Sequence, residues 1–220
     1  MKKVRWIIGI TLIIIGIGIM GVAFGMRYYG QVQQKNMMNN FEKSIVNDKQ
    51  ESNVDSINKT PSDKAPEDNL GAIGIIRIPK IDVKVAIGEG VDMNTLKYAV
   101  GHFPQTAMAG EKGNFCVAGH RSYTYSEYFN RLDEVNKGDE IFVKTKKAEY
   151  RYIVYEKKIV EPSEYSVLDS TKDATLTLIT CTPIRVATHR LIIKARLQWN
   201  ENYAQSIHKT VDNVNRLKYH

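Results

Sequence analysis

An uncharged apolar stretch from Trp6 to Phe24 is the feature that most restricts how this chain of 220 residues folds. A helix rises about 1.5 Å per residue, so roughly 20 apolar residues cross the hydrocarbon core of a membrane. The stretch has 19 residues. A cleaved signal peptide is the alternative, but its apolar region usually has about 7–15 residues and an Ala-x-Ala-like site follows it. The greater length and the lack of such a site favour an uncleaved transmembrane helix.

Basic residues on either side of the stretch predict its orientation. Lys2, Lys3 and Arg5 precede it, and Arg27 follows it closely. Because an excess of Lys and Arg marks the cytoplasmic flank of a membrane span, we expect the N-terminus inside the cell and the remainder outside. Residues 1–26 are therefore predicted to form a cytoplasmic stub and a single-pass anchor in the cell membrane.

Two polar segments flank the part of the chain that can fold. Residues 27–69 are rich in Asn, Gln, Lys, Ser and Asp, and Pro61 and Pro66 lie near their end. Such a composition buries too little apolar surface to offset the entropy of ordering, so we expect mainly an extracellular linker, with a helix over residues 37–46 as an alternative. Residues 199–220 form a polar C-terminal tail, which is either frayed or a short amphipathic helix.

The charge and cysteine content exclude several classes of protein. The net charge is +7, with 31 Lys and Arg against 24 Asp and Glu. The basic residues are spread along the chain and do not alternate with aromatics, so we expect no nucleic-acid partner. Two cysteines, Cys116 and Cys181, are too few for a disulfide scaffold and lack the paired spacing of a zinc site.

Residues 70–198 carry the pattern of an all-β domain. Short segments rich in β-branched residues and bounded by Gly, Pro or Asn are predicted strands. These segments are 71–79, 83–87, 114–118, 140–145, 149–160, 175–180 and 189–197. Brief helices are expected over 93–100, where Asp92 is an N-cap candidate, and within 125–132. About seven or eight short strands with small helical insertions predict a barrel or a sandwich.

Three residues with catalytic chemistry fall at the ends of predicted strands. Cys181 closes one strand just before Pro183, which cannot extend a ladder. Arg190 opens the next strand, and His120 closes an earlier one. A thiolate is stabilised by a nearby imidazolium or guanidinium, His can protonate a leaving amine, and Arg can donate to an oxyanion. Taken alone, such residues are more often structural, so they form a candidate set only.

Three motifs in the right order resemble those of the sortase family. Thr177-Leu178-Ile179-Thr180-Cys181 matches the family's TLxTC signature, Ala118-Gly119-His120-Arg121 matches the segment with its histidine, and His189-Arg190-Leu191 matches the strand with its arginine. The resemblance covers roughly residues 70–198 and implies an eight-stranded sortase-type β-barrel behind an N-terminal transmembrane helix.

The resemblance also implies an activity on the outer face of a Gram-positive cell. Cys181 would cleave an LPxTG-like sorting signal between Thr and Gly through a thioacyl intermediate. His120 would act as acid and base, and Arg190 would hold the substrate and stabilise the oxyanion. The protein partners would be surface proteins with sorting signals, and a cell-wall precursor or a pilin lysine would supply the amine. Thr180, Ala118 and Arg185 are expected to contact substrate, with a solvated loop charge as the alternative role for Arg185.

The subclass stays open among three sortase classes. Thr182-Pro183 after the cysteine and Thr188 before His189 resemble pilus-building class C enzymes. Those enzymes usually carry a lid with an Asp-Pro-aromatic motif and often a second span, and neither is present in the sequence. A single anchor without a lid is more similar to class D, and less so to class A.

No metal or other cofactor is expected. Some class A members bind calcium through acidic loop residues, for which Glu111, Glu161 and Glu164 are candidates, but solvated surface charge is the preferred interpretation.

Other residues are expected to be structural. His102 is one, and His189 should point away from Arg190 because neighbours on a strand face opposite sides. Cys116 is expected to be buried, with a disulfide to Cys181 as the alternative.

Two rival kinds of function are another cysteine enzyme and a non-catalytic binding barrel. L,D-transpeptidases carry Ser-x-Gly-Cys with an arginine two residues later, whereas Thr180 precedes Cys181 here and Pro183 follows. A papain-like protease fits poorly, because its cysteine lies early in the domain near a helix. A non-catalytic surface-binding barrel is the second rival, and the presence of the Cys, His and Arg together argues against it.

Overall fold

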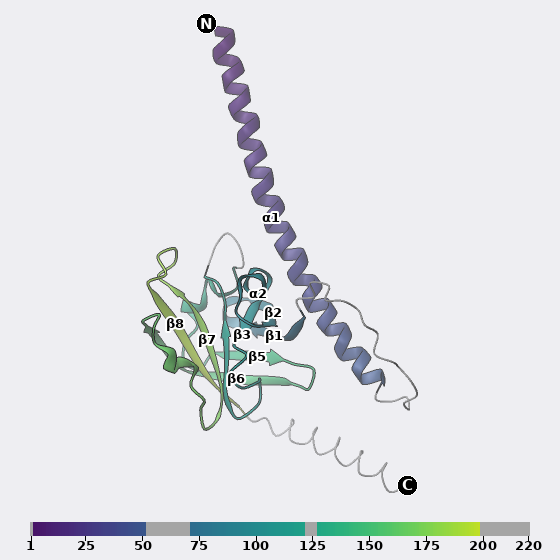
Figure 1. Ribbon diagram of the computed structural model, residues 1–220, viewed down its shortest axis with the longest axis vertical. Helices are drawn as coiled ribbons and strands as arrows, with labels where there is room; N and C mark the ends of the chain where they lie inside the picture. The colour runs from purple at the N-terminus through teal and green to yellow at the C-terminus, as the bar shows by residue number, and fades with distance from the viewer. Residues whose placement is uncertain (1, 52–70, 122–126, 199–220) are drawn as a thin grey trace.

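The computed structural model describes residues 2–51, 71–121 and 127–198, and it shows a long helix attached to a closed β-barrel (Figure 1). The barrel has the strand order β1-β2-β3-β4-β7-β8-β6-β5, so the predicted eight-stranded barrel is confirmed. The strands are β1 (Ala72–Ile78), β2 (Val83–Glu89), β3 (Val100–His102), β4 (Gly113–Ala118), β5 (Glu140–Lys144), β6 (Glu149–Val160), β7 (Ala174–Thr182) and β8 (His189–Leu197).

Short helices fill the connections between the strands. They are η1 (Pro79–Ile81), α2 (Met93–Tyr98), η2 (Glu127–Phe129), η3 (Leu132–Glu134) and η4 (Tyr165–Leu168). The predicted N-cap is confirmed, because the Asp92 carboxylate accepts hydrogen bonds from the backbone N–H groups of Asn94 and Thr95. The sequence prediction missed β3, and Val100 pairs with Ile87 of β2 instead of ending a helix. A strand of three residues has no periodicity of its own, so only its neighbours define it.

Two strand pairs in the barrel are parallel, β2 with β3 and β4 with β7. All other neighbours in the barrel are antiparallel. Parallel strands need a long crossover, and the crossover from β4 to β7 contains β5 and β6. The carboxyl ends of β4 and β7 consequently lie side by side at one edge of the barrel.

The alternation of side chains along β7 separates the barrel interior from an outer layer. Leu176 and Leu178 point inward and are fully buried in the main core. Ile179 faces outward and packs with Val167 of η4 and Ile192 of β8 in a separate cluster. Burying each such side chain contributes about 1.5–3 kcal/mol, so both faces of β7 hold the strand in place. The residues that follow Ile179 are therefore presented from a rigid element.

The helix α1 (Lys2–Glu51) is much longer than the predicted anchor. Residues 27–51, expected to belong mainly to a linker, continue the helix, so this part of the linker prediction is wrong. Met37, Phe41 and Ile45 recur every four residues and are buried against the barrel, where Phe41 and Ile45 pack on Ile75 of β1. The rest of the predicted linker, residues 52–70, and the predicted tail, residues 199–220, lie outside the described residues.

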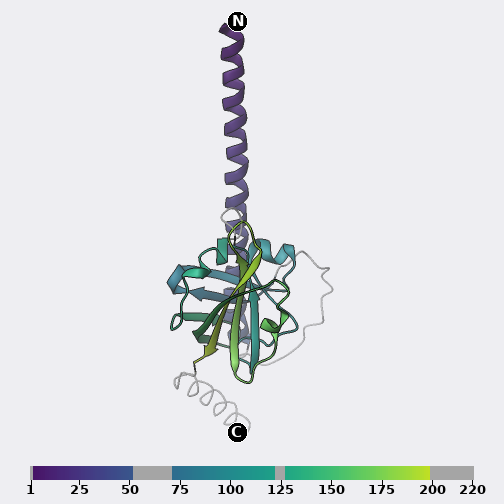
Figure 2. The same ribbon diagram turned by 90° about the vertical axis from the view of Figure 1, so that its left-hand side faces the viewer.

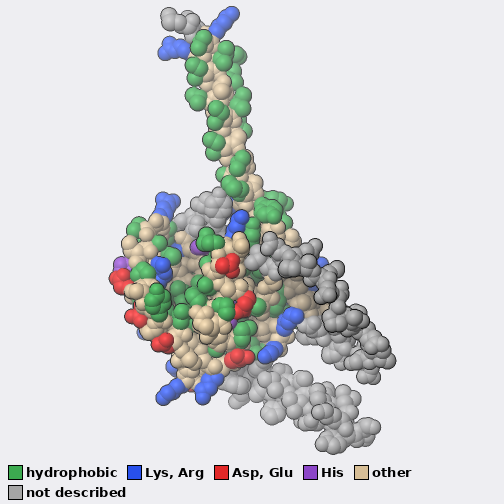
Figure 3. Space-filling view, in the orientation of Figure 1, with side chains coloured by type: hydrophobic (Ala, Val, Ile, Leu, Met, Phe, Trp, Pro, Cys, Tyr) green, Lys and Arg blue, Asp and Glu red, His purple; other side chains and the backbone are tan. Residues whose placement is uncertain are grey.

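The apolar part of α1 stands clear of the barrel. Between Trp6 and Phe24 its large side chains are exposed, and Figure 3 shows hydrophobic groups covering this half with basic groups at its tip. The helix is a candidate membrane span by length and composition. Figures 1 and 2 both place the β7–β8 loop at the barrel end from which α1 projects. The end of the barrel that carries Cys181 thus faces the side of the anchor.

Candidate active site

Cys181 and Arg190 are direct partners across the β7–β8 ladder. Side chains of directly opposed residues leave the same face of a sheet with their Cβ atoms about 4.5–5.5 Å apart. The sequence predicted Cys181 where a strand passes into a loop. In the structure β7 extends one residue further, to Thr182, so the thiol is held within the last pairs of a regular ladder. Cys181 is half-buried and unpaired with any other cysteine, so its thiol is free.

His120 follows the strand that runs parallel to β7. Ala118 pairs with Ile179, and the N–H of Gly119 donates to the carbonyl of Ile179 over 3.0 Å. β4 ends at Ala118, so His120 lies two residues beyond it, at the edge of the barrel where β7 carries Cys181. The order of β4, β7 and β8 therefore brings the three predicted catalytic residues to one edge of the barrel, with Cys181 on the middle strand.

The residues on both sides of Cys181 bond to the residues on both sides of His120. The Thr180 hydroxyl donates to the carbonyl of Gly119 over 2.7 Å. The Arg121 guanidinium donates from Nη1 to the Thr182 hydroxyl over 2.8 Å. These two bonds connect the segment of the histidine to the strand of the cysteine on either side of the candidate pair. Thr180, predicted to bind substrate, faces inward and is buried, so its visible role is to hold this connection.

Arg121 is a residue whose importance the sequence prediction missed. Its side chain is only 5% exposed, and its Nη2 lies 2.7 Å from a carboxylate oxygen of Asp133. Its Nε donates to the carbonyl of Asn130 over 3.2 Å. A buried guanidinium needs such partners, because an uncompensated buried charge is strongly destabilising. The signal in the sequence was an arginine directly after the candidate histidine, together with an acidic residue in the next helical segment.

The guanidinium of Arg190 is held by the β7–β8 loop. Nη1 donates to the carbonyls of Ala187 and His189 over 3.1 and 3.0 Å. A guanidinium has five N–H donors, and the two on Nη1 account for these bonds. The Nε and Nη2 groups carry the other three donors, which suit a substrate carbonyl or an oxyanion. Arg185, predicted to contact substrate, is exposed on the same loop with a φ of 69°, a left-handed conformation that is uncommon for arginine.

An apolar surface lies next to Cys181 on the outer face of the barrel. Ala118, predicted to contact substrate, packs with Ile179 of β7 and Val167 of η4. The Asn114 side chain fixes the β6–β7 loop there by donating to the carbonyls of Val167 and Asp169 over 2.9 and 3.0 Å. This anchored loop forms an apolar wall two residues from the thiol, because Ile179 and Cys181 point to the same side of β7.

The two cysteines have different surroundings and are both free. Cys116 is fully buried and pairs with Thr177, four residues before Cys181 along β7, so the structure contains no Cys116–Cys181 disulfide. Burial raises the pKa of the Cys116 thiol to about 12. Its thiolate is therefore scarce at neutral pH, which agrees with the expected role as a buried bystander.

Two other histidines are held in structural contacts. The His102 ring is 1% exposed and lies between Glu89, 3.1 Å from Nδ1, and the Ala107 carbonyl, 3.2 Å from Nε2. His189 pairs with Glu161 at 3.0 Å, so its ring is engaged away from the candidate site. Both arrangements fit the sequence interpretation of these residues.

The acidic candidates for calcium are dispersed. Glu111 faces Lys147 at 3.9 Å, Glu161 pairs with His189, and Glu164 accepts a hydrogen bond from Ser166. Within residues 2–51, 71–121 and 127–198, no three acidic, histidine or cysteine side chains are grouped as metal ligands. Independence from calcium stays a prediction.

The fold and site together define a class, that of closed β-barrels with a strand-borne cysteine between a histidine and an arginine. The family model described as Sortase domain matches residues 76–198, more than half of the chain. The chain belongs to the sortase family. Members of this family are transpeptidases of the cell surface that act on surface proteins and pilins.

Individual relatives come from several sortase classes. Sortase A of Listeria monocytogenes is 29% identical over 91% of this chain and 91% of its own length. Sortase D of Bacillus subtilis is 33% identical over 51% of this chain and 55% of its own length. The solved structure of a Clostridium perfringens Sortase D5 transpeptidase is similar with a TM-score of 0.63, at 31% identity over 76% of this chain and 99% of that one. The similarity is therefore mixed among classes.

Proposed function

We propose that this protein cleaves an LPxTG-like sorting signal between Thr and Gly and transfers the new carboxyl end to an amine. The observation that carries the proposal is the pairing of Cys181 with Arg190 across β7 and β8, beside the parallel strand that leads to His120. This arrangement supplies a nucleophile, an acid–base group and an oxyanion donor on rigid elements at one edge of the barrel.

The first half of the reaction forms a thioester. The Cys181 thiolate attacks the carbonyl carbon of the Thr–Gly bond, and the electron pair of the carbonyl moves to oxygen. The Nε and Nη2 donors of Arg190 stabilise this oxyanion. The carbon–nitrogen bond then breaks as imidazolium His120 protonates the leaving glycine amine, which leaves the acyl group on sulfur and the imidazole neutral.

The second half transfers the acyl group to an amine from a cell-wall precursor or a pilin lysine. Neutral His120 accepts a proton from the amine as its nitrogen attacks the thioester carbon. The carbon–sulfur bond breaks and the thiolate of Cys181 is regenerated beside imidazolium His120. Both groups then have the protonation states with which the cycle began.

The apolar surface beside Cys181 supports recognition of a signal that begins with Leu and Pro. Ala118 and Ile179 would contact these side chains against the wall formed by the β6–β7 loop. Arg185 would contact the polar part of the substrate from the β7–β8 loop, where its side chain is exposed.

The apolar helix near the N-terminus indicates that the protein is anchored in a membrane. We propose that the catalytic barrel is extracellular and the N-terminus cytoplasmic, which the Lys and Arg before Trp6 support.

A peptide assay tests the proposed reaction. The full-length protein in detergent is incubated with an LPxTG peptide and hydroxylamine, and we expect the hydroxamate of the Leu-Pro-x-Thr fragment. Cys181→Ala should abolish the product, whereas Cys116→Ala should retain it. Product from the Cys181→Ala variant would overturn the mechanism, and no product from the unmodified protein with any sorting-signal variant would favour a non-catalytic binding barrel.

A further inference from the structure

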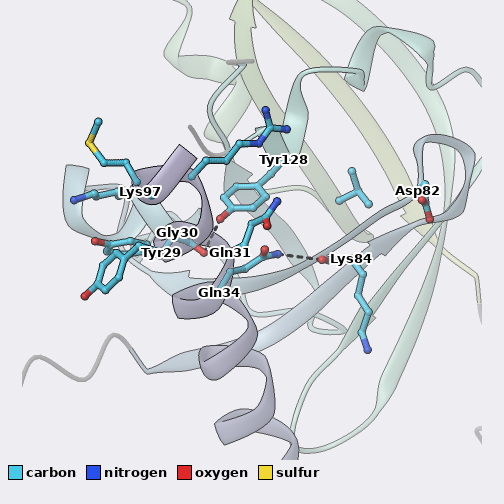
Figure 4. Close-up of a pocket in the computed structure, with 13 residues that line it drawn as sticks. Tyr29, Gly30, Gln31, Gln34, Asp82, Lys84, Lys97 and Tyr128 are labelled. Carbon is cyan, nitrogen blue, oxygen red and sulfur yellow. Dashed lines mark hydrogen bonds between the residues drawn. The ribbon is translucent and has the colours of Figure 1, made fainter. Parts of the chain in front are cut away.

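A pocket of about 420 Å³ lies between α1 and the barrel, and none of its lining residues belongs to the proposed active site (Figure 4). One wall comes from residues 25–34 of α1. The other walls come from residues 82–84 at the start of β2, from Lys97 and Tyr98 of α2, and from Tyr128 of η2. The pocket is thus built where the helix first meets the folded domain.

The walls of the pocket are fastened to one another. The Gln34 side chain donates to the carbonyl of Lys84 over 3.2 Å, which joins α1 to β2 (Figure 4). The Tyr128 hydroxyl donates to the carbonyl of Tyr98 over 2.9 Å, which joins η2 to α2. Tyr29 of α1 also packs edge-on against Tyr98, with ring centroids 6.4 Å apart. These contacts hold the pocket open in a defined shape.

The position of the pocket along α1 corresponds to the surface of a membrane. The uncharged span ends at Phe24, and the lining of the pocket begins at Gly25. The hydrocarbon core is about 30 Å thick and the full bilayer about 40–45 Å, so a headgroup layer of roughly 5–8 Å follows the end of the span. At about 1.5 Å per residue, the first turn or more of the pocket wall lies within that layer.

The charges around the pocket favour an anionic ligand. Arg27, Lys84 and Lys97 line it, against the single acidic residue Asp82. Lys84 also faces Glu42 at 3.4 Å, and Glu42 lies outside the pocket lining. Tyrosines at the headgroup level, such as Tyr29, are typical of membrane interfaces because one end is apolar and the other is wet.

We propose that this pocket binds the headgroup of an anionic glycerophospholipid from the membrane that holds α1. The phosphate would lie against Arg27 and Lys97, and the acyl chains would remain beside the exposed apolar side chains of the span. A headgroup held there would fix the barrel against the membrane surface. The proposal rests on membrane anchoring by α1 and not on the transpeptidase reaction, so either can fail alone.

Native mass spectrometry of the full-length protein in micelles containing equal phosphatidylglycerol and phosphatidylcholine tests the proposal. We expect one retained phosphatidylglycerol per chain, well above phosphatidylcholine. The Arg27→Gln/Lys97→Gln double variant should reduce this preference by about 25-fold, since each of the two cations near a lipid surface is worth about fivefold in binding. A matched control, Lys112→Gln/Lys172→Gln, removes two exposed lysines outside the pocket and should keep the preference.

A second variant tests whether the lipid needs the empty volume of the pocket, and it leaves the charged residues unchanged. Gly30 lines the pocket, and a Cβ added there meets nothing within 4 Å. Gly30→Leu should therefore fold normally, as judged by circular dichroism, but should occupy the space and lower lipid retention. Equal retention of both lipids by the unmodified protein, or a preference that survives in both pocket variants, would overturn the proposal. Dimers without lipid would indicate a second copy as the occupant, and binding of inorganic phosphate without lipid would indicate a soluble anion; either result overturns it.

Discussion

The guanidinium of Arg121 donates to the hydroxyl of Thr182 over 2.8 Å, and these two residues are the chain neighbours of His120 and Cys181. The bond crosses from the end of β4 to the end of β7, where the parallel ladder no longer connects the strands. It matters because a misplacement of about 1 Å between reacting groups can cost about a hundredfold in rate. Arg121 is therefore a positioning residue in this account.

Arg121→Gln should lower kcat by about 10–100-fold with little change in KM, because it loosens the geometry of the reacting groups and leaves the substrate surface intact. The kcat of Arg121→Lys should fall between that of the unmodified protein and that of Arg121→Gln. Lysine keeps the charge but not the planar fork that reaches Asn130, Asp133 and Thr182. The measurement is steady-state hydroxamate formation at a temperature at which circular dichroism shows every variant to be folded.

A matched control for this prediction lies in the same segment. Arg131→Gln removes an exposed arginine that pairs with Glu134 at 2.8 Å, and it should leave kcat within about twofold. If Arg121→Gln lost stability but kept the kcat of the unmodified protein, its role would be structural only.

The two cysteines should differ sharply in reactivity. With a pKa of about 12, buried Cys116 holds very little thiolate up to pH 10, whereas Cys181 is only half-buried. We expect iodoacetamide to modify a single thiol of the folded protein between pH 7 and pH 10, and Cys181→Ala to abolish that labelling. Peptide mapping by mass spectrometry identifies the site. Equal modification of Cys116 in the folded protein would contradict the burial described above.

His120 and His189 allow a proposed catalytic histidine to be compared with a structural one as its control. His120→Gln should reduce kcat by about 10²–10⁴-fold, the usual contribution of general acid–base catalysis. His189→Gln should have little effect, because the His189 ring pairs with Glu161. Steady-state kcat of the two variants is the check. A loss of kcat in His189→Gln as large as the loss in His120→Gln would show that His189 is the acid–base group.

The packing of α1 on the barrel should depend on Phe41. Phe41 is 3% exposed and packs with Ile45 and Ile75, so Phe41→Ala should weaken the docking of this half of the helix by about 3–5 kcal/mol. Hydrogen exchange of the backbone amides of residues 35–47 should accelerate, while that of β7 should not change. Val46→Ala, at an exposed position of the same helix, is the control. Unchanged protection in Phe41→Ala would mean that the helix is not held by this contact.

The strands of the barrel could be predicted because each long strand carries its own pattern. The alternation around Leu176 and Leu178 and the breaks at Pro and Gly located β7 within two residues at its C-terminal end. The strand order, the two parallel pairs and β3 could not be predicted, because they depend on contacts between distant segments. The register that places Cys181 opposite Arg190 could not be predicted either, although their separation of nine residues along the chain suggested a hairpin.

The sequence prediction failed where polar composition concealed a local pattern. Residues 27–51 are polar overall, yet Met37, Phe41 and Ile45 form a stripe at helical spacing, which the helix alternative over residues 37–46 covered only in part. Arg121 was missed because its partners, Asn130, Asp133 and Thr182, come together only in the folded barrel.

The central claim is that Cys181 carries the acyl group between cleavage and transfer. Acid quenching of the reaction with an LPxTG peptide, followed by intact-protein and peptide mass spectrometry, measures this directly. We expect a mass increase equal to the Leu-Pro-x-Thr acyl group on the peptide that contains Cys181, and its loss when hydroxylamine is added before the quench. Cleavage of the substrate with no adduct on Cys181, or an adduct on Cys116, would contradict the account.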